Sequence, residues 1–200
     1  MSIPFYKHTA SITCITYCSD DAILFGSDDQ TIIKWNMSEH GKNVVLISNK
    51  NNTESEKVYC MAIPSDRTIL AYAKSNLIRL FDIVYNIEVE KPSEGHIWPV
   101  LSLAFSSDGN KILSASADNT VRIWNWQTKL QNNAQNPYNL SGIDSAPILL
   151  VFSPDNNSLA SGLTNSLIRV WNTDTGEESG AALKGHSLWI SCLEYTLDGK

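Results

Sequence analysis

The stretch SADNTVRIWNW, from Ser116 to Trp126, places an acid, Asp118, six residues before a tryptophan, Trp124. An acid and an indole at a fixed spacing can form a chemical site, or they can belong to one copy of a structural unit. The rest of the chain decides between the two interpretations, because related stretches recur: IKWN at 33–36, RLFD at 79–82 and RVWN at 169–172. The aromatic positions Trp35, Phe81, Trp124 and Trp171 are 46, 43 and 47 residues apart. This period indicates an internal repeat.

Two further markers keep the same order within each repeat. The segment LAFSSDGNKILSAS (103–116) aligns with ITYCSDDAILFGS (15–27), MAIPSDRTILAYA (61–73) and LVFSPDNNSLASG (150–162). A Gly-His pair at Gly95-His96 returns at Gly185-His186, and Lys7-His8 stands in the corresponding place near the start. Three markers in a constant order at one period make a much stronger signal than any one of them.

Each repeat is predicted to consist of short strands. VLSLAF and KILSAS are rich in strand-forming residues, and the SSDG between them is typical of a tight turn. TVRIWNW forms a third strand, and NVVLI (43–47) and GAAL (180–183) mark a fourth in two repeats. Four short strands per unit of about 45 residues predict an all-β chain folded as a β-propeller of four-stranded antiparallel blades. We place the repeats of this single propeller domain, residues 1–200, at about 8–47, 54–90, 95–140 and 142–184, with a partial unit at 185–200.

Composition excludes several classes of function. The chain is 42% hydrophobic and 18% charged, as expected for a globular protein, and its net charge is −6. Clustered Lys and Arg are absent, so no nucleic-acid partner is expected. No apolar stretch is long enough for a signal peptide or a membrane span, so we expect no membrane association and a cytoplasmic location, with the nucleus also possible. The four cysteines do not suggest a disulfide framework.

The order Gly-His, apolar strand, Ser-x-Asp-Gly turn and Asp-x-Thr-Val-Arg-Ile-Trp-Asn resembles the WD-repeat β-propeller family. The resemblance extends over nearly the whole chain, and the third unit is most similar. The run from Thr175 to Lys200 also resembles the repeat arrays attached to fungal signalling NTPases. The resemblance implies a hydrogen-bonded network in the third unit, formed by His96, Ser114, Asp118 and Trp124.

The alternative interpretation of His, Asp and Ser is a nucleophilic catalytic triad. The recurrence of His and Asp with the repeat, and the position of the serine inside a predicted strand, favour a structural role. We therefore expect no enzyme activity, no cofactor, no metal and no small-molecule substrate. Cys14 and Cys60 occupy equivalent positions in their repeats, where the third has Ser102, and Cys192 falls at the same place in the fifth. We interpret these cysteines as small packing residues.

The other repeats retain only part of this network. The first has His8, Asp29 and Trp35 but Phe25 at the serine position, and the second has Glu54, Ala71, Ser75 and Phe81. The fourth keeps Ser161 and Trp171 but has Ile143 and Asn165 in place of His and Asp, and the fifth begins with His186. We therefore expect the second repeat to depend on apolar packing alone.

The resemblance implies that partners bind one face of the propeller, formed by the loop after Gly-His and by the residue just before the repeated Asp. In this sequence the first group is Ala10, Ser11, Trp98, Pro99, Leu188 and Trp189, and the second is Asp28, Lys74, Ala117 and Thr164. Trp98 and Trp189 stand out, because tryptophan is enriched in interface hot spots. The alternative interpretation is that these two side chains pack against the loop of the neighbouring blade. The leading hypothesis is a non-catalytic scaffold that binds proteins or peptides. The alternative is a regulatory or sensor array of a larger multidomain signalling protein.

The predicted repeats do not make a closed ring, and an open ring leaves strand edges exposed. We expect a piece of a longer propeller, of seven blades by analogy with the family. A split propeller completed by another chain, a shortened gene model and a compact four-bladed ring are the alternatives.

Overall fold

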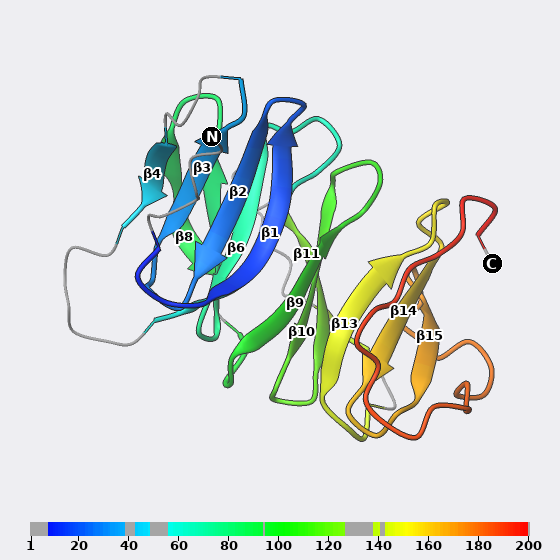
Figure 1. Ribbon diagram of the computed structural model, residues 1–200. Helices are drawn as coiled ribbons and strands as arrows, with labels where there is room; N and C mark the ends of the chain where they lie inside the picture. Colours follow the sequence, from blue (N-terminus) through cyan, green and yellow to red (C-terminus); the bar gives the residue numbers. More distant parts are fainter. Residues whose placement is uncertain are drawn as a thin grey trace.

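The computed structural model describes residues 8–38, 43–48, 56–93, 95–126, 138–140 and 143–199. These residues form four antiparallel sheets, here called blades 1 to 4, which stand side by side in chain order (Figure 1). Blade 1 contains β1 (Ile12–Ser19), β2 (Ala22–Ser27), β3 (Ile32–Asn36) and β4 (Asn43–Ile47). Blade 2 contains β5 (Val58–Ala62), β6 (Ile69–Lys74), β7 (Leu77–Asp82) and β8 (Ile87–Ser93).

The other two blades follow the same up-and-down order of strands. Blade 3 contains β9 (Val100–Phe105), β10 (Lys111–Ser116), β11 (Val121–Asn125) and β12 (Tyr138–Asn139). Blade 4 contains β13 (Pro147–Phe152), β14 (Ser158–Leu163) and β15 (Ile168–Asn172). Sequential strands pair throughout, and the first strands β1, β5, β9 and β13 contact one another in turn. The predicted all-β propeller blades are confirmed.

The Ser-x-Asp turns join the first and second strands of the blades. In blade 3, Ser106 donates a 2.5 Å hydrogen bond to Asp108, and the backbone N–H of Asn110 donates to the same carboxylate oxygen. Gly109 has φ +72°, a left-handed conformation that glycine adopts without steric cost. The short carboxylate binds backbone donors that would otherwise lack a strand partner, so the turn is fixed locally.

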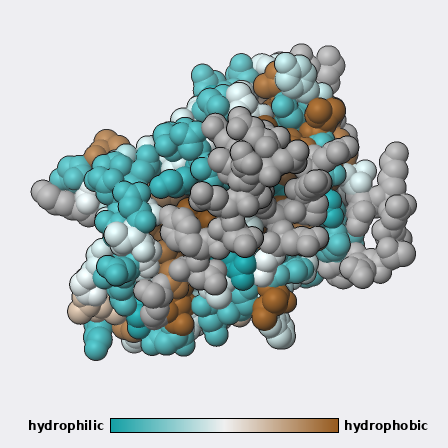
Figure 2. Space-filling model, turned by 180° about the vertical axis from the view of Figure 1, so that it is seen from behind, coloured by the Kyte–Doolittle hydropathy of each residue, from teal (hydrophilic) through white to brown (hydrophobic). Residues whose placement is uncertain are grey.

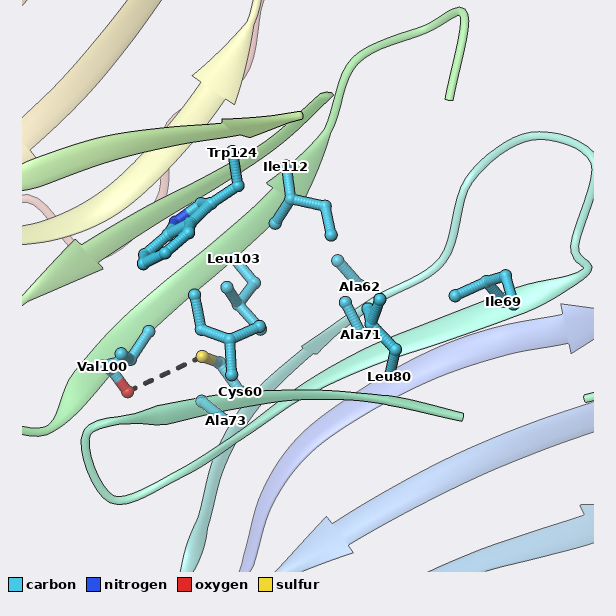
Figure 3. Packing of buried hydrophobic residues seen from close by; sticks show 11 residues of the cluster. Cys60, Ala62, Ile69, Ala71, Ala73, Leu80, Val100, Leu103, Ile112 and Trp124 are labelled. Atoms are coloured by element: carbon cyan, nitrogen blue, oxygen red, sulfur yellow. Dashed lines mark hydrogen bonds between the residues drawn. The ribbon is translucent and has the colours of Figure 1, made fainter. Parts of the chain in front are cut away.

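The core lies between neighbouring blades. In the contact of blades 2 and 3, Val100, Leu103, Ile112 and Trp124 form one buried cluster with side chains of blade 2, as Figure 3 shows. The residues from blade 2 are Cys60, Ala62, Ile69, Ala71, Ala73, Ile78 and Leu80. Small and large side chains of the preceding blade thus share this core with the large ones of blade 3. Each large apolar side chain buried in this way contributes about 1.5–3 kcal/mol to stability.

The fourth blade departs from the expected four strands. The segment 178–183 runs beside β15 but forms only two isolated bridges with it, Trp171 with Glu178 and Ile168 with Leu183. Gly180 lies between the bridges with φ +81°, which interrupts the extended conformation that a continuous strand requires. The described part of the fifth unit, 185–199, contains no strand. It crosses blade 4 as the red segment in Figure 1, with Ile190 buried against Gly162.

The side of the molecule turned away in Figure 1 is mostly hydrophilic over its described residues, with scattered hydrophobic side chains (Figure 2). Among the described residues, no helix has the length and apolar character needed to cross a membrane.

Candidate functional site

The third blade brings His96, Ser114, Asp118 and Trp124 into one hydrogen-bonded chain. Trp124 Nε1 donates to Ser114 Oγ at 2.7 Å, and the same hydroxyl lies 2.7 Å from His96 Nε2. His96 Nδ1 lies 2.9 Å from Asp118 Oδ2. The imidazole and indole rings meet edge to face, with centroids 6.0 Å apart. A neutral His96 protonated at Nδ1 satisfies every one of these contacts, with the serine donating to Nε2.

Burial sets the ionisation of the two titratable members. Burial lowers the pKa of His96 and outweighs the attraction of Asp118, which acts in the opposite direction. For Asp118, burial alone would raise the pKa, but hydrogen bonds from Thr120 and His96 lower it below its usual range. The pair is therefore a neutral imidazole beside a carboxylate. The serine hydroxyl is buried in β10, so it is not placed like an exposed nucleophile.

Asp118 and Ser116 also fix the loop that precedes β9. The backbone N–H of Ile97 donates to Asp118 Oδ2 at 3.1 Å, and Ser116 Oγ donates to the carbonyl of Trp98 at 2.8 Å. The backbone N–H of Ala117 donates to the carbonyl of Pro99 at 3.0 Å. The indole of Trp98 is 61% exposed on this fixed loop. A buried network thus fixes the backbone of the loop that carries this exposed aromatic side chain.

The first blade keeps the acid half of this arrangement. His8 Nδ1 lies 2.9 Å from Asp29 Oδ2, and Thr31 Oγ1 donates to Asp29 Oδ1 at 2.6 Å. Phe25 stands where blade 3 has Ser114, opposite Ile33 in the strand register. Among the described residues, His8 Nε2 is buried with no hydrogen-bond partner. The network therefore ends at the histidine in this blade.

The second blade does not depend on apolar packing alone, so that expectation is wrong. The register places Tyr72, and not Ala71, at the position of Ser114, because Leu70 pairs with Phe81 as Ile112 pairs with Trp124. Tyr72 Oη donates a 2.6 Å hydrogen bond to Glu88 on β8. Arg79 contacts the same carboxylate oxygen at 3.2 Å. Ala71 instead faces blade 3, and Glu54 lies outside the described residues.

Sequence reasoning missed an arginine–glutamate pair that recurs in two blades. Arg79 and Glu88 in blade 2 correspond to Arg169 and Glu178 in blade 4, which are 2.9 Å apart. In both blades the arginine lies two residues before the aromatic position and the glutamate pairs opposite that aromatic residue. Arg169 also contacts Asp144 at 3.2 Å. The shared spacing of arginine to aromatic residue was visible in the sequence, but the register of the outer strand was not.

In the fourth blade, Ser161 Oγ donates to the carbonyl of Leu149 at 2.9 Å, in a bond within the blade. Asn165 Nδ2 donates to Asp144 at 3.3 Å, and Ile143 packs beside the apolar cluster that contains Trp171. In the fifth unit His186 is exposed.

The residues expected on the partner-binding face differ widely in exposure. Trp98, Leu188 and Trp189 are 61%, 70% and 69% exposed, and Ala10, Ser11 and Thr164 are also exposed. Asp28, Pro99 and Ala117 are half-buried. Lys74 is buried, at 5% exposure, and its expected place on an open loop is wrong. Leu70 and its partner Phe81 are 11 residues apart, one fewer than Ile112 and Trp124, so Lys74 ends β6 at the position of Ser116.

The cysteines follow the repeat in the structure. Cys14, Cys60 and Ser102 pair with Gly26, Ala73 and Ala115 at equivalent places in their sheets. Burial raises the pKa of both Cys14 and Cys60. Cys192 is exposed. In the part of the chain that the structure describes, no three His, Cys, Asp or Glu side chains cluster closely enough to hold a metal ion.

The four-stranded blades and the His–Ser–Asp–Trp network define the class of this protein as a repeat-built β-propeller. The family model "WD domain, G-beta repeat" matches residues 2–36, 89–125 and 140–172, which is more than half of the chain. The chain therefore belongs to the WD-repeat family.

Individual relatives match a large part of this chain and a smaller part of their own. "Small ribosomal subunit protein RACK1" of Candida albicans is 29% identical over 132 residues, which cover 62% of this chain and 40% of that protein. "Transcription factor unc-37" of Caenorhabditis elegans is 26% identical over 124 residues, covering 62% and 19%. A solved structure described as "Structure of U3-55K" superimposes with TM-score 0.77 at 27% identity, covering 93% of this chain and 55% of that one. The matched part of this chain therefore covers less than half the length of RACK1 and of unc-37.

Proposed function

We propose that this protein is a non-catalytic interaction scaffold that binds partner proteins or peptides through one face of the propeller. The face consists of exposed and half-buried residues before the first strands and beside the repeated acid: Ala10, Ser11, Trp98, Pro99, Leu188, Trp189, Asp28, Ala117 and Thr164. The main support is the exposed indole of Trp98 on a loop that Asp118 and Ser116 fix through hydrogen bonds. A loop whose backbone is already fixed loses little conformational entropy on binding, and tryptophan is enriched in interface hot spots, so both features favour affinity.

The net charge of the chain and its membership of the WD-repeat family both favour proteins as binding partners. The net charge is −6, and counterion-driven binding to phosphates requires a positive surface. The absence of nucleic-acid binding and the cytoplasmic or nuclear location stay predictions, since relatives include "Pre-mRNA-processing factor 17" of Saccharomyces cerevisiae. Belonging to the WD-repeat family supports a role in assembly.

The test is to compare captured partners of the wild type with those of the double variant Trp98→Ala, Trp189→Ala by affinity purification and mass spectrometry. We expect the double variant to lose partners, with binding weakened at least tenfold, because truncating a hot-spot tryptophan costs about 2 kcal/mol or more. Tyr85→Ala is the matched control, since Tyr85 is an exposed aromatic residue in the turn between β7 and β8. An unchanged set of partners in the double variant would remove this face as the binding site.

A regulatory array within a longer signalling polypeptide is the second candidate. It is favoured by the match to "Apoptotic protease-activating factor 1" of Rattus norvegicus, where 121 aligned residues cover 9% of that protein. Both candidate functions could use the same partner-binding face. The mass of the endogenous product, detected with an antibody against the described residues, distinguishes them: a product near 22.2 kDa contradicts the longer polypeptide.

A further inference from the structure

Blades 2, 3 and 4 have an arginine at one equivalent position of the third strand, two residues before the aromatic position: Arg79, Arg122 and Arg169. In blades 2 and 4 this arginine has an acidic partner. Arg79 contacts Glu88 at 3.2 Å, and Arg169 contacts Glu178 at 2.9 Å. In blade 3, by contrast, no hydrogen bond or ion pair with another described residue reaches the guanidinium of Arg122.

The outer strand of blade 3 supplies no acid to this arginine. In blades 2 and 4 the glutamate comes from the segment that runs outside the third strand. In blade 3 the described outer strand β12 consists of Tyr138 and Asn139, and Asn139 pairs with Arg122. The residue before them in the sequence is Pro137. None of these three side chains carries a negative charge, so they leave the charge of Arg122 without a counterpart.

The loop before the first strand supplies no acid to Arg122 either. In blade 4, Asp144 contacts Arg169 from this loop at 3.2 Å. The residue at the same place in blade 3 is Ile97, because each stands two residues before the carbonyl that accepts the backbone hydrogen bond from the turn after the second strand. Ile97 is 77% exposed, beside Trp98 at 61%. An exposed apolar side chain thus replaces one of the two carboxylates that Arg169 contacts.

The guanidinium of Arg122 lies beside the Gly-His pair, with its terminal nitrogens open to solvent. A Cβ added at Gly95 would collide with Arg122 Nη1, so this nitrogen lies against the bare glycine backbone. Burial lowers the pKa of His96, and the positive charge of Arg122 acts in the same direction. Arg122 Nε is buried without a partner, but the side chain as a whole is half-buried and neither Nη atom is among the buried unpaired groups. A carboxylate can therefore approach the two Nη atoms.

The backbone beside Arg122 is fixed from the neighbouring blade as well as from its own. Asn76 of blade 2 donates a 2.8 Å hydrogen bond to the carbonyl of His96. Asp118 of blade 3 accepts from His96 and from Thr120. The side chain of Asp118 is only 3% exposed, so this carboxylate is already engaged and does not compete for Arg122.

We propose that Arg122 binds an aspartate or glutamate side chain of a partner polypeptide, and that an apolar side chain next to this acid lies against Ile97 and Trp98. The proposal rests on the proposed function, because it names the class of partner for the same face. Charge complementarity supports it, since the chain itself supplies a carboxylate to the equivalent arginine in two blades. A guanidinium binds a carboxylate through charge-assisted hydrogen bonds, which are stronger than bonds between neutral groups.

The test uses the full chain and two capped, fluorescently labelled pentapeptides, Gly-Leu-X-Leu-Gly, in which X is glutamate or glutamine. Fluorescence anisotropy is expected to show that the glutamate peptide binds about tenfold more tightly, because glutamine keeps the shape of the side chain and lacks the charge. Equal binding of the two peptides, or no binding of the glutamate peptide at millimolar concentration, would overturn the proposal.

Single-residue variants locate the site through the ratio of the two affinities. Arg122→Gln is expected to remove the tenfold difference while keeping the wild-type circular dichroism spectrum. Ile97→Asp is expected to remove it as well, because the new carboxylate contacts Arg122 as Asp144 contacts Arg169 in blade 4. Ile97→Asn is the uncharged control and Arg67→Gln, at an exposed arginine in the turn after β5, is the arginine control; both keep the difference. A difference that persists in Arg122→Gln contradicts the assignment.

Trp98→Ala separates this proposal from the proposed function. The variant is expected to weaken both peptides to a similar extent, because Trp98 contacts the apolar side chains that the two peptides share, and to keep the tenfold ratio. If both affinities stayed unchanged in Trp98→Ala, the contact with Trp98 would be wrong, while the loss or persistence of the ratio in Arg122→Gln would still decide the role of Arg122.

Discussion

Ser114 connects two rings of the network through its single hydroxyl. It accepts from Trp124 Nε1 and contacts His96 Nε2, both at 2.7 Å, in a fully buried position. Ser161 stands at the same repeat position in blade 4, where its hydroxyl donates to the backbone carbonyl of Leu149. The same residue type at the same position thus has different surroundings in the two blades.

The substitution Ser114→Ala is therefore expected to lower the free energy of unfolding more than Ser161→Ala. Losing the shared hydroxyl leaves His96 Nε2 without this partner and removes an acceptor from Trp124, which costs about 2–3 kcal/mol, against about 1 kcal/mol for Ser161→Ala. Urea unfolding followed by tryptophan fluorescence measures both. If the two variants lost equal amounts of unfolding free energy, the bonds of Ser114 to His96 and Trp124 would stabilise the fold no more than the single bond of Ser161 does.

At the scale of whole elements, the contact between blade 4 and the fifth unit depends on a glycine. A Cβ at Gly162 would lie 2.8 Å from Cβ of Ile190, which is closer than real side chains approach. Ile190 is the single buried residue in the described segment 185–199, and the segment has no strand of its own. Packing of this side chain against the bare backbone of β14 holds the segment on the blade.

Gly162→Ala is expected to displace Ile190 and to loosen the segment 185–199 while leaving blades 1 to 3 folded. Limited proteolysis with peptide mapping should show cleavage in this segment several-fold faster than in the wild type, because local opening exposes its backbone. Thr164→Ala, an exposed change near the end of β14, is the control. Cleavage that increases equally across all blades would indicate global destabilisation and contradict this local role.

For the molecule as a whole, acid is expected to reduce stability in two separate ranges of pH. His96 has a folded pKa below its ordinary 6.5, so the unfolded chain binds the proton more readily and stability falls as pH drops below about 6.5. Asp29, Asp108, Asp118 and Asp155 have folded pKa values below the ordinary 3.8. Their contribution is retained above pH 3.8 and lost as pH falls below it.

The measurement is the free energy of unfolding between pH 8 and 3 for the wild type and for His96→Gln. The variant is expected to be less stable at pH 7 and to lose the decline between about pH 6.5 and 5, while keeping the decline below pH 4. A variant with the same slope as the wild type near pH 6 would show that another group causes the upper decline.

Much of this architecture could be predicted from local spacing. His96, Asp118 and Trp124 stand at intervals that recur, and a recurring local hydrogen-bond pattern leaves a recurring set of residue types. The second blade shows where this reasoning fails. Tyr72 takes the position of Ser114, but one residue fewer separates Leu70 from Phe81 than Ile112 from Trp124, so comparison of repeats assigned Ala71 and predicted apolar packing. The same missing residue moved Lys74 from an expected loop into a buried strand end.

The sequence by itself determined the period, the all-β blades and the members of the network in the third unit, because strands, turns and their capping residues interact over short distances along the chain. Only the tertiary structure decided that Glu88 reaches Tyr72, that Ile190 packs on Gly162, and that Phe105, Phe152 and Tyr195 line one open pocket. These contacts join different strands and different repeats. They depend on pairing register and on the packing of one sheet against the next, which residue spacing does not specify.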